Sequence, residues 1–190
     1  MASAFTHGFA AILVGRLCFS GSRPSRFQLP AIVLSVLPDV DVMAFAFGIP
    51  YGSVWGHRGF THSLFFAFLA SLVASHLVFR ESPRFSRKWW LVTAGLFSAT
   101  ASHGLLDAMT DGGLGVAFFA PFDEGRYFFP WRPLRVSPVG IGAFFSGWGA
   151  RVIVSEMVWI WIPALALLFL LRQARGSLGR TRSSRLQPDD

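Results

Sequence analysis

The stretch VIVSEMVWIWIPALALLFLL, residues 152–171, is apolar at nearly every position. About 20 such residues are needed for a helix to cross the hydrocarbon core of a bilayer. Glu156 lies within its first two turns, where we expect it to reach the membrane interface. Basic residues begin directly after it, at Arg172, as is typical of a cytoplasmic flank. The stretch therefore predicts a transmembrane helix.

The composition of the whole chain agrees with a membrane protein. Of 190 residues, 53% are hydrophobic, 16% aromatic and only 14% charged, and the mean hydropathy is +0.49. A soluble domain carries roughly 25% charged residues. This excludes a soluble cytosolic enzyme and a disordered chain. The single cysteine, Cys18, excludes a disulfide scaffold, and the scarcity of Glu and Lys excludes a coiled coil.

Four further apolar runs precede this helix, at residues 3–19, 29–49, 63–79 and 89–109. The last two predict a helical hairpin around the basic link 80–88. Run 29–49 is interrupted by Pro38, Asp39 and Asp41, so it can be re-entrant rather than fully spanning, and so can run 3–19. We expect an all-α polytopic membrane protein with about four to five membrane-embedded helices. It forms one domain over residues 1–172, followed by a basic, disordered cytoplasmic tail over residues 173–190.

The net charge of +7 indicates orientation rather than nucleic-acid binding, because no recognition motif accompanies the basic residues. With the link around Arg23 and Arg26, residues 80–88 and the tail all cytoplasmic, twelve of the 17 basic residues lie inside, Arg16 included. The other five lie outside: Arg58, Arg126, Arg132, Arg135 and Arg151. The tail can also lie on anionic lipid. Segment 110–151, rich in Gly, Pro and aromatic residues, is then an extracytoplasmic loop at the headgroup level.

Polar residues interrupt these runs in four places, and each place maps to the extracytoplasmic side. They are His7; Asp39 and Asp41; His57 and His62; and His103 with Asp107. The orientation was derived from Lys and Arg positions alone, so this coincidence is an independent indication that the residues share one site.

The residue types and spacings predict a metal centre. His103 and Asp107, four residues apart on one helical face, can bind one ion, or Asp107 can orient the imidazole. Pro38 allows an irregular turn that directs Asp39 and Asp41 inward. Two carboxylates buried there without a cation would cost several kcal/mol. Four histidines and three carboxylates suit Zn²⁺, or Mn²⁺, and one or two ions.

Several roles remain open at this stage. Asp41 or Asp107 would act as general base and Arg58 would clamp an anionic phosphate, although an interfacial Arg is as often a lipid anchor. His103 with Asp107 can instead be a helix–helix hydrogen-bond pair. Thr61 is a candidate N-cap for run 63–79. The remaining polar residues have other expected roles. His76 hydrogen-bonds a neighbouring helix, and Asp111 extends the site or begins the loop. Asp123, Glu124 and Glu156 are solvated or interfacial.

The order of these motifs resembles the YdjM-type family of small inner-membrane proteins, described as metal-dependent hydrolases. The resemblance covers about residues 6–138 and is most specific at HRGFTHS, residues 57–63. It implies a polytopic membrane protein with a metal-hydrolase site at the residues named above. Some members are described as LexA-binding, a property that no residue here explains. The His-x-x-x-Asp element is also weakly similar to that of zinc-dependent phospholipase C enzymes.

The sequence therefore predicts an inner-membrane, metal-dependent hydrolase that acts on a phosphoester or another lipid-linked substrate at the extracytoplasmic interface. Membrane lipids are the expected partners, and no nucleic acid is expected. Two alternatives use the same residues. One is a metal-ion or proton transporter, although polar residues are few in the inner halves of runs 63–79 and 89–109. The other is a non-catalytic scaffold with a structural metal.

Overall fold

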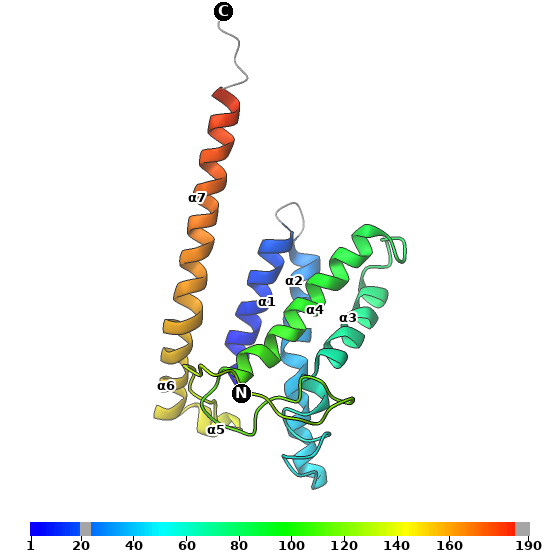
Figure 1. Cartoon of the computed structure of the whole chain (residues 1–190), viewed down its shortest axis with the longest axis vertical. Coiled ribbons are helices and arrows are strands. Elements are labelled where there is room, and N and C mark those ends of the chain that lie inside the picture. The colour runs from blue at the N-terminus through cyan, green and yellow to red at the C-terminus, as the bar shows by residue number, and fades with distance from the viewer. Residues whose placement is uncertain (20–23, 185–190) are drawn as a thin grey trace, which may run out of the picture.

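The computed structural model describes residues 1–19 and 24–184 and is helical throughout its regular elements (Figure 1). The elements are α1 (Ala4–Cys18), α2 (Pro24–Val36), η1 (Leu37–Phe47), η2 (Phe60–His62), α3 (Leu64–Val78), α4 (Arg87–Ala108), α5 (Ile141–Phe144), α6 (Gly147–Glu156), η3 (Met157–Trp161) and α7 (Ile162–Ser184). The described residues form no strand, only isolated bridges between Thr110 and Leu134 and between Val116 and Tyr127. The predicted all-α class is confirmed.

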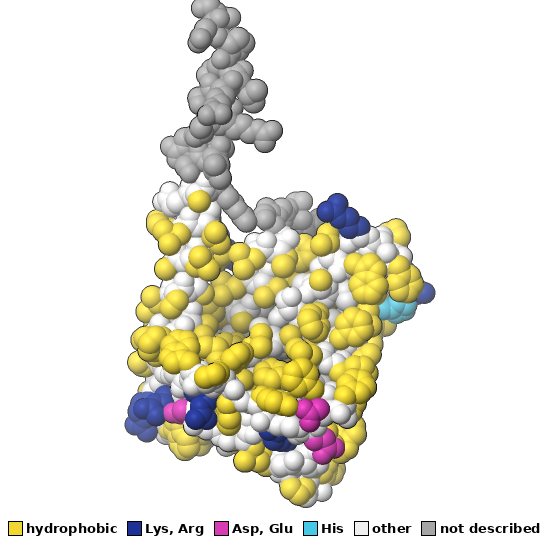
Figure 2. Space-filling model, in the orientation of Figure 1, with side chains coloured by type: hydrophobic (Ala, Val, Ile, Leu, Met, Phe, Trp, Pro, Cys, Tyr) yellow, Lys and Arg dark blue, Asp and Glu magenta, His cyan; other side chains and the backbone are white. Residues whose placement is uncertain are grey.

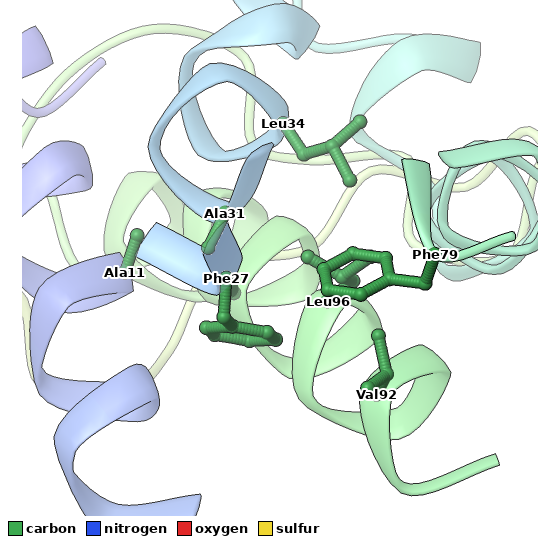
Figure 3. Close-up of a cluster of buried hydrophobic side chains, with 8 residues drawn as sticks. Ala11, Phe27, Ala31, Leu34, Phe79, Val92 and Leu96 are labelled. Atoms are coloured by element: carbon green, nitrogen blue, oxygen red, sulfur yellow. The ribbon is translucent and has the colours of Figure 1, made fainter. Parts of the chain in front are cut away.

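Helices α1 to α4 form a bundle in which α4 contacts each of the other three. Alanines at the contacts let the helices approach closely, and larger side chains from α2, α4 and the end of α3 fill the space between them. This core consists of Ala11, Phe27, Ala31, Leu34, Phe79, Val92, Leu96 and Ala99 (Figure 3). The bundle is the rigid support from which the polar residues project at one end.

The second apolar run changes helix type where the sequence predicted an interruption. α2 ends at Val36 and a 3₁₀ helix, η1, continues to Phe47. Pro38 lacks the N–H that an α-helix would use, which favours this change. The irregular segment directs Asp39 and Asp41 inward, with side chains only 10% and 3% exposed.

Two stretches are long and apolar enough to cross a membrane, Arg26–Phe47 and Gly147–Ala174, and the shorter helices Ala4–Cys18 and Leu64–Val78 are also apolar. α4 covers the predicted run 89–109 as a helix but is not among these stretches. The number of membrane-embedded helices therefore stays a prediction. On the face in Figure 2, hydrophobic side chains cover the middle of the molecule, and most of the charged side chains lie towards its two ends.

The C-terminal helix begins earlier than predicted, at Gly147, and changes to a π-helical turn at Met157–Trp161. Pro163 lies two residues after this turn, and its missing N–H accounts for a local change of helix type. α7 continues past residue 172 to Ser184. Residues 185–190 of the predicted tail, and Arg23 of the predicted cytoplasmic link, lie outside the described residues. The division at residue 172 stays a prediction.

Candidate metal centre

Five segments bring the predicted site residues together at one end of the bundle, near the N-terminus in Figure 1. α1 carries His7, η1 carries the two aspartates, the loop before η2 carries His57, η2 ends at His62, and α4 carries His103 and Asp107. Two groups have ligand atoms within 4.8 Å of one another: Asp39, His62, His103 and Asp107 form the deep cluster, and Asp41, His57 and His62 form the second group.

In the deep cluster, two imidazole nitrogens and two carboxylates surround one point. His62 Nε2 lies 3.0 Å from His103 Nε2. Asp39 Oδ1 lies 3.3 Å from His103 Nε2 and 3.6 Å from His62 Nε2. Asp107 Oδ2 lies 3.6 Å from His62 Nε2. This is the ligand number and the mixture of nitrogen and oxygen that Zn²⁺ takes in proteins.

The other nitrogen of each imidazole fixes its tautomer. His103 Nδ1 lies 2.7 Å from the carbonyl oxygen of Ser35, which only accepts, so Nδ1 carries the proton. His62 Nδ1 lies 3.1 Å from Asp41 Oδ2. In their neutral forms both rings therefore present Nε2 lone pairs to the same point, the arrangement in which histidine binds a metal.

The deep cluster holds a buried carboxylate, Asp39, whose only ion-pair partners among the described residues are histidines. Both oxygens of Asp39 are buried and have no hydrogen-bond partner of good geometry among the described residues, whereas Asp107 Oδ2 forms an ion pair with Arg58 Nε, 3.0 Å away. Oxygens such as those of Asp39 are costly to leave unpaired. Burial opposes a charge on His62, but the neighbouring carboxylates of Asp39 and Asp41 outweigh it and raise the pKa of His62 to about 9. The residues present therefore fit a divalent cation.

Asp41 supports the ligands rather than facing the same point. Its Oδ1 lies 2.7 Å from His57 Nδ1, and its Oδ2 accepts from the Arg58 N–H at 3.1 Å and from Thr61 Oγ1 at 2.7 Å. With His62 Nδ1, these donors occupy both oxygens. A carboxylate that holds the far nitrogen of a ligating histidine is a common device for orienting it.

His7 borders the deep cluster without belonging to either group. Its ring stacks on that of His103, with centroids 3.7 Å apart, and its Nε2 lies 3.5 Å from Asp107 Oδ1. Neither His7 nitrogen has a hydrogen-bond partner among the described residues. The sequence-based set is thus gathered in one place, with His7 at its edge.

Arg58 is buried and its guanidinium is directed into the protein. Nε lies 3.0 Å from Asp107 Oδ2, and the two terminal nitrogens donate to Gly112 O and Thr110 Oγ1, each at 2.9 Å. Its φ of 63° lies in the left-handed region, which is costly for a residue with a side chain and is often found at functional sites. In this arrangement Arg58 fixes Asp107 rather than presenting a fork to a phosphate.

Glu156 was expected to be solvated or interfacial, and this expectation is wrong. Its side chain is fully buried. It accepts hydrogen bonds from Ser3 N, Ser3 Oγ and Thr6 Oγ1, and so fastens the C-terminal helix to the start of α1. The neighbouring Ala2 N–H donates to Asp107 Oδ1 at 2.6 Å. A glutamate inside an apolar run was the available signal for this role, since a charge there is expensive.

Two smaller expectations are also corrected, and the alternative left open for Asp111 is decided. Ser63, not Thr61, caps α3, because its side chain accepts from Phe66 N. His76 accepts from Arg84 in the link between α3 and α4 instead of binding a neighbouring helix, and it lies far from the site. Asp111 pairs with Arg135 and does not extend the site. Asp123 and Glu124 are exposed, as expected.

One close approach determines how η2 and α4 meet. A Cβ on Gly104 of α4 would lie 2.9 Å from the backbone oxygen of His62. Glycine at this position therefore lets the segment bearing His62 come close enough to His103 for their rings to converge.

The fold and this cluster define a helical membrane protein with a buried His/Asp group of metal-ligating type. The chain belongs to the YdjM inner membrane protein family, whose pattern it matches over residues 1–177. It is 37% identical over 176 residues to the inner membrane protein YbcI of Escherichia coli (strain K12), a match that covers 90% of this chain and 97% of that protein. No solved structure matches the chain. The family and this relative indicate an inner-membrane location.

Proposed function

We propose that the protein is a metal-dependent hydrolase of the inner membrane that acts on a phosphoester or another lipid-linked substrate. The observation that carries the proposal is the convergence of His62 Nε2, His103 Nε2 and the carboxylates of Asp39 and Asp107 on one point. A divalent cation bound there would supply Lewis-acid chemistry, making water a better nucleophile near neutral pH and offsetting charge on a phosphoester.

The ligands are His62, His103, Asp39 and Asp107, with His7 as a further candidate beside them. Two imidazoles with carboxylates suit Zn²⁺ best and Mn²⁺ next. The second group shares His62 with the deep cluster, so it offers a place for a second ion. With one ion, Asp41 and His57 would instead orient His62.

The general base is best assigned to Asp39. Asp41, one of the two acids named from the sequence, already holds donors on both oxygens. Asp107, the other, is fully buried and paired with Arg58. Asp39 has two free oxygens and is the most exposed carboxylate of the three, so one oxygen can bind the cation while the other accepts a proton from water.

The distribution of basic residues supports a site on the extracytoplasmic side. The link between α3 and α4, with Arg80 and Arg84, lies at the opposite end of the bundle from the site (Figure 1). The positive-inside rule puts that link in the cytoplasm. A multi-pass arrangement of α1 to α4 and α6 to α7 follows from this orientation.

The test is metal analysis and hydrolysis by the detergent-purified protein, on panels of phospholipids and phosphoesters. Wild type is compared with Asp39→Ala and His62→Ala, and with His76→Ala and Asp123→Ala as matched controls away from the site. We expect bound metal and hydrolysis in wild type and controls, and loss of both in the site variants. Stoichiometric metal without hydrolysis would favour a scaffold, and metal-dependent flux into proteoliposomes without hydrolysis would establish a transporter.

A further inference from the structure

A mostly apolar groove of about 530 Å³ leads to the deep cluster. Cavities of roughly 300–1,000 Å³ are typical of small-molecule sites. Three segments form its walls: the start of α1, η1, and the stretch around α5. Its apolar lining includes Ala4, Phe5, Val42, Val139, Phe144 and Phe145. The Phe5 and Phe144 rings, 6.1 Å apart, join two of these walls.

Asp39 belongs both to the lining of this groove and to the deep cluster. The other three members of the cluster are almost completely enclosed: His62 is 4% exposed and His103 and Asp107 are 0% exposed. Asp39 also keeps both carboxylate oxygens free of donors. A reactant can therefore reach the cluster through the groove, at the side where Asp39 lies.

The groove is chemically suited to hydrocarbon. Among its described lining residues the charged groups are Asp39 and the amino group of Met1, and there is no Lys, Arg or His side chain to recognise a sugar, a nucleotide or a second phosphate. Its two serines are buried: the Ser3 hydroxyl binds Glu156, and the Ser137 hydroxyl is turned to the Pro138 carbonyl. At the rim, Phe5 and Phe145 are 61% and 80% exposed, as suits side chains that face lipid.

We propose that this groove binds the hydrocarbon chain of a membrane amphiphile while its anionic head lies at Asp39 and the deep cluster. The proposal rests on the function proposed above and narrows its substrate to a molecule that enters sideways from the bilayer. A hydrocarbon chain gains no hydrophobic free energy when it moves from the bilayer into the groove, because both are apolar. The groove therefore selects among amphiphiles by the shape of the chain, and it positions the head group.

A second apolar cavity supplies the control. It lies between α2 and α3, has a volume of about 690 Å³ and is lined by Val33, among others, but by none of the candidate metal ligands. Val33 and Val42 lie on the same apolar stretch, Arg26–Phe47. Val42→Trp and Val33→Trp therefore add the same side-chain volume to two apolar grooves, of which only one leads to the cluster.

The experiment uses the zinc-loaded full chain in detergent and two photoreactive probes with a phosphonate head, one with a straight hexadecyl chain and one with an isoprenoid chain. We expect crosslinks in η1 or residues 137–145 of wild type. Val42→Trp should lower them at least tenfold, whereas Val33→Trp should leave them unchanged, with equal zinc in all three proteins. The probe that labels more strongly identifies the chain type.

Crosslinks of both probes outside the groove would overturn the proposal, and so would equal labelling of Val42→Trp and wild type. If Val42→Trp loses zinc, the comparison with this variant is set aside. The position of the wild-type crosslinks, inside or outside the groove, then decides whether the groove binds the hydrocarbon chain. Labelling in the groove without hydrolysis of any substrate would contradict the hydrolase function and leave the groove assignment standing. Hydrolysis together with labelling outside the groove would contradict the groove assignment and leave the hydrolase function standing.

Discussion

His62 Nε2 and His103 Nε2 lie 3.0 Å apart, although the two residues come from different segments. The Nδ1–H of His103 faces the Ser35 carbonyl oxygen, and the Nδ1–H of His62 faces Asp41. Without metal, a protonated His62 can donate a hydrogen bond across this distance; with a bound cation, both nitrogens would face the ion instead. A metal centre at this point therefore depends on the residues that hold the two rings in place.

Asp41→Asn should weaken metal binding without abolishing it. The amide keeps one acceptor but loses the charge that holds His57 and His62, and loss of such an orienting carboxylate typically costs about 10–100-fold in metal affinity. Competition with a chelator of known affinity measures the change. Asp123→Asn, at an exposed position, is the control and should bind as wild type does; an unchanged affinity in Asp41→Asn would remove the orienting role.

Gly104→Ala should reduce metal affinity at least tenfold. The added methyl group would meet the His62 carbonyl oxygen, so η2 must move away from α4. Gly8→Ala is the matched control, since the nearest atom to its Cβ is a side-chain carbon 3.8 Å away. Zinc titration measures the affinity of both variants. Equal affinities would show that the close approach does not determine the geometry of the site.

Glu156→Gln should destabilise the protein. The amide nitrogen would face donors instead of accepting from Ser3 and Thr6, and hydrogen bonds to a charged group contribute about 1.5–3 kcal/mol. For a chain of this size a loss of about 2 kcal/mol lowers the melting temperature by roughly 4–8 °C. Glu124→Gln, at an exposed position, should not change it. Equal melting temperatures for the two variants would mean that Glu156 does not fasten α6 to α1.

Zinc binding at pH 7 should release a proton. The pKa of His62 is about 9, so without metal the ring is protonated at pH 7, and it must lose that proton to become a ligand. Affinity should therefore rise with pH until pH passes about 9. Calorimetry in buffers of different ionisation enthalpy counts the protons, and a count of zero would contradict His62 as a ligand.

Much of the site could be predicted because isolated acids and histidines are rare inside apolar sequence. Asp39 and Asp41 were identified by the cost of burying two carboxylates without a cation, and His103 with Asp107 by their spacing on one helical face. The basic flanks then placed them at one end of the molecule, and the structure brings them together. Pro38 likewise predicted where the second run changes helix type.

The roles within the site could not be predicted, because they depend on contacts between distant segments. Asp39 and Asp41 look alike in sequence, yet only Asp41 meets the donors of residues 57–62. Arg58 was expected to face a phosphate but pairs with Asp107, and Glu156 was expected at the interface but binds the start of α1. Each of these outcomes requires knowing which elements pack together.

X-ray absorption at the zinc edge tests the central claim most directly. The purified, zinc-loaded protein should show two imidazole nitrogens and carboxylate oxygens at about 2.0–2.2 Å. His103→Ala should lose one imidazole from the first shell, while His76→Ala should reproduce the wild-type spectrum. A wild-type spectrum without imidazole, or one unchanged in His103→Ala, would contradict a metal centre at His62 and His103.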